Sequence, residues 1–189
     1  MAYLKQSGPW LYDNASGDIV GFKDDDGSEV YFARAATYGS FYDIADQTAD
    51  EDEATVIDLG ETDIANGISI ADGSKITVTR TGTYNLQFSA QLANDGGQEQ
   101  NVSFWLAKQG SSIAATNSDV TVPKSHAGGD GHAVAAWNWF VQLNAGQYVE
   151  LMWSTPSTNI TIEHKDAQAS PTRPVTPSVI VTITEVSQA

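Results

Sequence analysis

The sequence predicts an all-β protein, an antiparallel β-sandwich or barrel preceded by a separate β-hairpin. Apolar and polar residues alternate with a period of two through most of the chain, Gly-containing turns separate these runs, and no amphipathic helix longer than two turns stands out. The chain has 189 residues, 41% hydrophobic and 10% aromatic, which suits one domain, or one domain plus an arm, with enough apolar residues for a real core.

The clearest strand covers residues 83–92, where apolar and polar side chains separate onto opposite faces. The same alternation recurs in later and earlier segments that are rich in Val, Ile, Thr and aromatic residues. The shared apolar faces are Tyr84, Leu86, Phe88, Ala90 and Leu92; Val102, Phe104 and Leu106; Trp137, Trp139, Val141 and Leu143; Val149, Leu151 and Trp153; Ile160 and Ile162; and Val179, Val181 and Ile183. Turns are predicted at 66–67, 72–73, 95–97 and 144–146 because Gly, Asn and Asp accept positive φ.

The distribution of apolar segments and turns predicts two parts of the chain. Residues 1–38 form an N-terminal arm, and residues 39–189 form the main domain. Within the first unit, two apolar segments flank a turn that contains Asp26 and Gly27, which is typical of a β-hairpin. An isolated hairpin is marginal in water and needs a partner surface. The apolar residues expected to anchor this arm are Ile19, Val20, Phe22, Val30, Tyr31 and Phe32.

Composition excludes several classes of function. Nine Lys and Arg against 24 Asp and Glu give a net charge of −15, which is unsuited to binding nucleic acid or an anionic membrane. No apolar run approaches the ~18 residues of a membrane span. The absence of cysteine removes disulfides, thiolate metal sites and thiol catalysis. Residues 1–7 lack the apolar stretch of a signal peptide, so we expect a protein made in, and retained or assembled in, a cytosol.

Two acidic clusters and the histidines are the residues to consider as metal ligands. The run at 50–53 is interpreted as a solvated acidic loop rather than a Ca²⁺ site, and 24–27 as a hairpin turn because it fails the EF-hand pattern. His126 and His132 flank a Gly-rich loop with Asp130 and are interpreted as surface groups, and His164 as a satisfied histidine at a strand edge. We therefore expect no metal and no cofactor.

The tryptophans allow two interpretations. Trp105, Trp137, Trp139 and Trp153 are suited either to a sugar-stacking platform or to a core and subunit interface, and the second is favoured because aromatics dominate sandwich interiors. Trp105 and Phe140 lie opposite the apolar faces of their own strands. A sandwich has one inner face per strand, so these two residues are expected at an interface between subunits.

Six segments resemble, in order, the strands of a C1q/TNF-like jelly roll, namely residues 39–43, 67–70, 82–91, 104–110, 143–151 and 177–180. The form most similar is that of tailed-bacteriophage virion structural proteins, and residues 16–29 resemble short anchor segments of such proteins. The resemblance implies an antiparallel jelly-roll β-sandwich that forms a homotrimer and has no enzymatic activity. The chain lacks the collagen-like stalk of animal C1q proteins.

No nucleophile elbow, Walker-type loop or zinc-protease helix occurs in the sequence, and no two carboxylates are singled out as a glycosidase pair. Together with the resemblance and with a length that fits one jelly roll and a short arm, this implies a non-enzymatic capsid decoration, or cement, protein that binds and stabilises the shell of the phage major capsid protein. It would sit on the capsid exterior of the virion after assembly in the host cytoplasm. The alternative is a receptor-binding tip or fibre protein that recognises a host-surface ligand, and a third possibility is a free carbohydrate-binding module.

Overall fold

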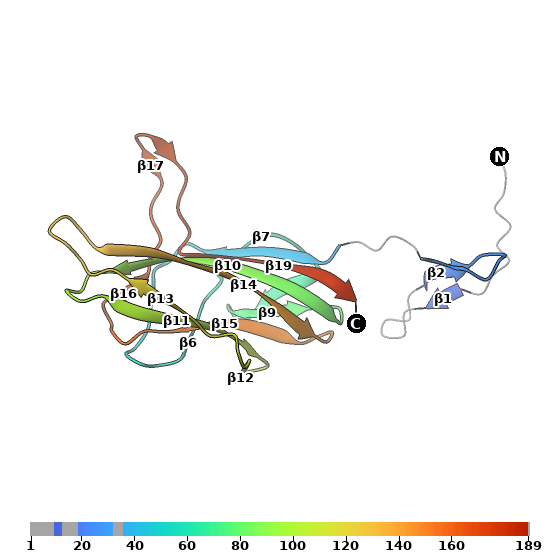
Figure 1. Cartoon of the computed structure of the whole chain (residues 1–189). Coiled ribbons are helices and arrows are strands. Elements are labelled where there is room, and N and C mark those ends of the chain that lie inside the picture. Colours follow the sequence, from blue (N-terminus) through green and yellow to red (C-terminus); the bar gives the residue numbers. More distant parts are fainter. Residues whose placement is uncertain (1–9, 13–18, 32–35, 189) are drawn as a thin grey trace. The chain divides into compact units, whose positions relative to one another are not determined.

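The computed structural model describes residues 10–12, 19–31 and 36–188 (Figure 1). The chain divides into two compact units, residues 1–36 and 37–189, called here the arm and the body. All regular structure in the described residues is β-strand, so none of them forms a helix that could cross a membrane.

The arm is a three-stranded antiparallel sheet of β1 (Trp10–Tyr12), β2 (Ile19–Lys23) and β3 (Glu29–Tyr31), with β2 in the centre. The hairpin predicted from sequence is confirmed, and β1 adds a strand that the prediction lacked. Asp24 closes the β2–β3 turn because its Oδ1 accepts the backbone N–H of Ser28 at 2.8 Å, and Gly27 takes a φ of 81°.

The body is a sandwich of two seven-stranded sheets, named here by their longest central strands. The β10 sheet consists of β4 (Tyr38–Asp43), β5 (Gln47–Thr48), β7 (Glu61–Asn66), β10 (Gly82–Asn94), β14 (Gly131–Leu143), β16 (Ile160–Ile162) and β19 (Val179–Gln188). The β11 sheet consists of β6 (Thr55–Val56), β8 (Ile68–Ala71), β9 (Lys75–Val78), β11 (Gln100–Lys108), β12 (Ser111–Ser112), β13 (Ser118–Val122) and β15 (Tyr148–Ser154). A small hairpin of β17 (Gln168–Ala169) and β18 (Thr172–Arg173) projects from the body (Figure 1).

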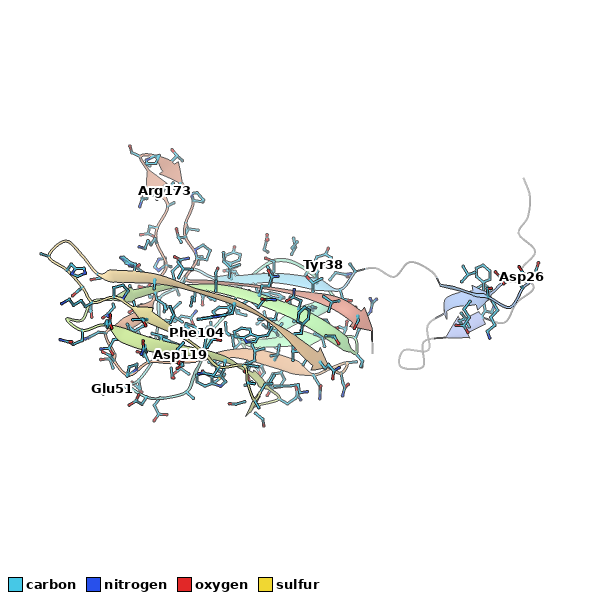
Figure 2. All side chains as sticks on the ribbon, in the orientation of Figure 1. Asp26, Tyr38, Glu51, Phe104, Asp119 and Arg173 are labelled. Atoms are coloured by element: carbon cyan, nitrogen blue, oxygen red, sulfur yellow. The ribbon has the colours of Figure 1, made fainter. Side chains whose placement is uncertain are left out.

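The core lies between the two sheets and contains the apolar faces predicted from the alternation. Tyr84, Leu86 and Ile183 from the β10 sheet are fully buried, as are Phe104 and Trp153 from the β11 sheet. Figure 2 shows Phe104 between the two layers. Every named strand pair in the body is antiparallel, which confirms the predicted fold class.

The first residues of the body are tied into its sheets. The backbone carbonyl of Thr37 accepts the N–H of Glu185 at 2.9 Å, and Tyr38 is paired with Thr184 at the start of β4. The sequence pattern placed the end of the arm at residue 38. A deletion that is meant to spare the body should therefore stop at residue 36.

Candidate functional site

One apolar row crosses the three strands of the arm. Trp10 is paired with Phe22 and Phe22 with Val30, so the three side chains share one face of the sheet. Trp10 and Phe22 are partly buried, and Val30 is 37% exposed. A sheet with one apolar face normally buries that face against another element.

The structure describes the six residues predicted to anchor the arm to different extents. Phe22 and Val30 belong to the apolar row. Ile19 and Val20 lie in β2 and Tyr31 lies in β3, and only the backbone of these three residues is described. Phe32 lies outside the described residues. Trp10 was not singled out from the sequence, because a strand of three residues is too short to show alternation. The anchoring role of all these residues stays a prediction.

The outer face of the β10 sheet carries most of the exposed apolar surface. Nine large hydrophobic residues are exposed among the described residues, and six of them lie on strands of this sheet. These six are Tyr38, Ile64, Val134, Phe140, Ile180 and Val186, with Phe140 the most exposed at 66%. No exposed large hydrophobic lies on a described strand of the β11 sheet. The strand register places Asn85 and Thr184 between Phe140 and Tyr38, so polar residues are interspersed in this patch. A face with this many exposed hydrophobic side chains is a candidate interaction surface.

Phe140 and Trp105, the two residues predicted at a subunit interface, face outward from different sheets. Phe140 lies on β14 opposite Asn85 of β10. Trp105 lies on β11 opposite Met152 of β15, and its indole Nε1 donates a hydrogen bond to the Ser112 Oγ at 3.1 Å. Both positions agree with the prediction that these side chains point away from the core. Their place at an interface stays a prediction.

The other three tryptophans of the body, Trp137, Trp139 and Trp153, belong to the core or pack against it, as favoured from the sequence. Trp153 is fully buried. Trp137 and Trp139 are partly buried and stack on Phe88, with ring centroids 5.6 and 5.2 Å from it. The Nε1 of Trp139 donates to the carbonyl of Thr116 at 3.1 Å, which holds the 113–117 loop over this aromatic group. These rings therefore do not form an open sugar platform.

The acidic clusters are held as turns. Asp52, with a φ of 60°, donates its backbone N–H to the carbonyl of Thr155 at 2.8 Å, which fixes the 50–53 loop against the end of β15. His126 closes the tight 126–129 turn through its backbone. Within the described part of the chain, no group of three His, Asp or Glu side chains converges as metal ligands.

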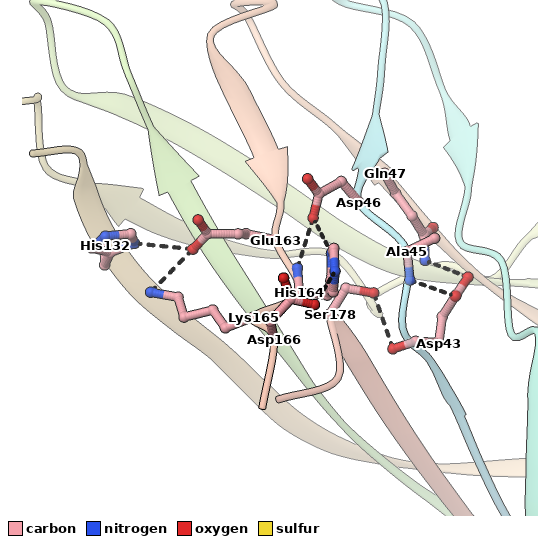
Figure 3. Close-up of polar contacts among 10 residues, drawn as sticks. All are labelled: Asp43, Ala45, Asp46, Gln47, His132, Glu163, His164, Lys165, Asp166 and Ser178. Carbon is pink, nitrogen blue, oxygen red and sulfur yellow. Dashed lines mark hydrogen bonds and ion pairs between the residues drawn. The ribbon is translucent and has the colours of Figure 1, made fainter. Parts of the chain in front are cut away.

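His164 and Asp46 form the tightest charged contact at one end of the β10 sheet (Figure 3). Asp46 Oδ1 lies 2.7 Å from Nδ1 of His164 and accepts its backbone N–H at 2.8 Å. The side-chain hydrogen bond to Asp46 raises the pKa of His164, and the backbone hydrogen bond from His164 lowers the pKa of Asp46. The imidazole Nε2 faces the Asp166 carboxylate at 3.8 Å rather than a hydroxyl nucleophile. This arrangement pairs charges and does not resemble a catalytic triad.

A second charged group lies beside it, where Glu163 Oε2 is 3.1 Å from Lys165 Nζ and 3.6 Å from His132 Nδ1 (Figure 3). The sequence interpretation of His132 as an unpaired surface group missed this contact. His132 and Glu163 come together because β14 and β16 both pair with the end of β10, opposite Ala93 and its neighbours. Only the pairing of the strands could have shown it.

Comparison with known proteins supports the fold. No family model and no curated protein matches the sequence. Among solved structures, the Eiger TNF of S. frugiperda is similar with a TM-score of 0.54 and 10% identity, covering 82% of this chain and 96% of that one. Murine APRIL is similar with a TM-score of 0.51 and 11% identity, covering 80% of this chain and 100% of that one. The body therefore has a TNF/C1q-like jelly-roll fold.

Proposed function

We propose that this protein is a non-enzymatic, trimeric decoration protein of a phage capsid, in which the arm binds the major capsid protein and the body stands on the outside of the shell. The single observation that carries this proposal is the division of the chain into a self-contained jelly roll and a separate small sheet with its own apolar row. The phage assignment comes from the sequence resemblance of residues 16–29 and of the jelly-roll segments.

The apolar outer face of the β10 sheet supports self-association. Its exposed hydrophobic side chains lie on the β4, β7, β14 and β19 strands, so the patch extends across the sheet rather than along one edge. Identical chains usually bury such a surface in an assembly of closed symmetry. The C1q/TNF-like resemblance selects threefold symmetry among the closed arrangements. Phe140 is the residue we expect nearest the contact between subunits, because it is the most exposed of the set.

Trimerisation would strengthen binding through the arms. A single sheet of three short strands offers a small contact area. Three arms on one trimer bind neighbouring capsid proteins at a raised effective concentration, so three weak contacts hold a trimer firmly. The net charge of −15 on each chain keeps decorated particles apart through like-charge repulsion.

Co-sedimentation with undecorated capsid shells tests the anchoring role. We expect the full-length chain to pellet with shells and a chain without residues 1–36 to stay in the supernatant. Val30→Asp in the full-length chain should weaken binding strongly, because it places a charge in the apolar row of the arm. Asp26→Asn, in the exposed turn between β2 and β3, is the matched control and should bind normally. Normal pelleting of the shortened chain would overturn the proposal.

A receptor-binding tip is the second candidate, because the body also presents a groove lined by a tryptophan and polar side chains. The distribution of the protein on the virion separates the two candidates. Density over the whole shell in cryo-microscopy would indicate a decoration protein. Density confined to a tail or to fibres would indicate a receptor-binding role.

A further inference from the structure

An open, shallow groove on the outer side of the β11 sheet brings an aromatic side chain together with several polar ones. It lies where β11 and β15 meet the loop that follows β12, and its volume is about 410 Å³. Its lining includes Ser103, Trp105, Ser112, Ile113, Asn117 and Ser154. Aromatic and apolar groups with a few placed polar groups are the usual composition of a small-molecule site.

Trp105 supplies a fixed aromatic surface in this groove. The bond from its Nε1 to Ser112 Oγ holds the indole, and the cross-strand neighbour Met152 lies beside it on the same face. The side chain is only partly buried, although the flanking Phe104 and Leu106 are fully buried on the other face of β11. An indole that is already oriented loses little conformational freedom when a ligand stacks on it.

The polar side chains of the groove are also oriented before any ligand binds. Ser103 Oγ donates to Asp119 Oδ1 at 2.7 Å, and the Asn117 side-chain N–H donates to the same oxygen at 3.2 Å. A hydroxyl that donates in this way still has lone pairs to accept, and a side-chain amide has a second N–H and a carbonyl oxygen. Ser154 is paired with Ser103 across β11 and β15, so a further hydroxyl lies next to this set.

The charge of the groove selects the class of ligand. None of the residues that line it is charged, and the chain as a whole carries −15. Phosphates, sulfated sugars and sialic acids would therefore meet repulsion without a cation to balance it. A pyranose ring of a neutral glycan has an apolar C–H face for the indole and hydroxyl groups for the serine and asparagine side chains. We propose that this groove binds one neutral pyranose unit of a glycan.

This inference goes beyond the proposed capsid-binding function and replaces the interface role that the sequence predicted for Trp105. It uses neither the arm nor the patch on the β10 sheet. The outer faces of the two sheets point in opposite directions from the core between them. An assembly through the β10 sheet therefore leaves the Trp105 groove accessible. A decoration protein with such a groove would add glycan binding to its attachment to the capsid.

Saturation-transfer NMR on the full-length chain tests the proposal with methyl glucoside, methyl galactoside, methyl mannoside and sialyllactose as probes. We expect saturable transfer to at least one of the three neutral glycosides and none to the sialic acid ring. Trp105→Ala should weaken that binding by roughly tenfold or more, and Trp105→Phe should retain part of it. Asn117→Ala should weaken it less, and Thr121→Ala, on β13 but outside the groove lining, is the matched control.

The native mass of each variant separates a ligand site from a subunit contact. We expect Trp105→Ala to keep the oligomeric state of the unmodified chain. Trp105→Phe keeps an aromatic ring at this position and is the control for loss of the fold. Absence of saturable binding to all three neutral glycosides would overturn the proposal. Binding that survives Trp105→Ala, or dissociation of the assembly by that substitution, would overturn it as well.

Discussion

The two sheets of the body bury similar inner faces but differ on their outer faces. The β10 sheet exposes six large hydrophobic residues, spread over four of its strands. The described strands of the β11 sheet expose none, and the tryptophan on their outer face, Trp105, is partly buried. The shared core determines the inner faces. The outer faces are under no such constraint, and our proposals for assembly and for ligand binding rest on the difference between them.

The largest effect that tests this difference is expected from Phe140→Asp. A charge in the apolar patch cannot be buried between subunits without a large desolvation cost. We expect the variant to run as a monomer of 20.2 kDa in light scattering coupled to size exclusion. Thr121→Asp places the same charge on an exposed position of the β11 sheet and should leave the assembly intact. An assembly that stays intact after Phe140→Asp would show that this patch is not the contact.

The next largest effect is expected from Phe104→Ala, which changes the core shared by both faces. Phe104 is fully buried, and its ring centroid lies 5.3 Å from that of Phe88 and 5.9 Å from that of Trp137. The free energy of unfolding should fall by about 3–5 kcal/mol. Urea unfolding at one fixed protein concentration measures this. A loss below about 1 kcal/mol would mean that the two sheets pack less tightly than described.

A smaller effect is expected from pH at the His164–Asp46 pair. The raised pKa of His164 stabilises the fold below the ordinary value of 6.5, and this contribution is lost as pH rises through the raised value. The lowered pKa of Asp46 stabilises the fold above the ordinary value of 3.8, and this contribution is lost as pH falls through the lowered value. The decrease in melting temperature caused by His164→Gln should therefore be greatest at pH values between these two pKa values. A loss that is the same at every pH, with no maximum between these two values, would refute the ion pair.

The smallest effect, close to zero, is expected from metal removal. The 50–53 loop is held by the backbone hydrogen bond from Asp52 to Thr155, next to the end of β15, and its carboxylates are exposed. We expect the melting temperature to be the same with and without a chelator. A fall of several degrees on chelation would show that these acidic residues hold Ca²⁺ and that our interpretation of them is wrong.

The sequence predicted the fold well where alternation was long. The run from Thr83 to Leu92 lies inside the thirteen-residue β10, and its apolar residues are buried as expected. It could not predict β1, because three residues carry no periodicity. The outward direction of Trp105 followed from its neighbours, since Val102, Phe104 and Leu106 define the buried face.

The polar contacts between side chains could not be predicted from the sequence. His164 and Asp46 are 118 residues apart, and they meet only because β5 pairs with β16 at the end of the β10 sheet. The bond between Trp105 and Ser112 likewise depends on the turn between β11 and β12. Side chains brought together by strand pairing leave no pattern in a single sequence, so the groove became visible only in the structure.

The native mass of the full-length chain in solution tests the central claim most directly, because both the anchoring by three arms and the separate roles of the two outer faces depend on a trimer. Light scattering coupled to size exclusion at micromolar concentration gives this mass without a calibration standard. The account predicts three copies of 20.2 kDa, or 60.6 kDa, and the same threefold state for residues 37–189 alone. A stable species of 20.2 kDa, or a trimer that forms only when the arm is present, would contradict it.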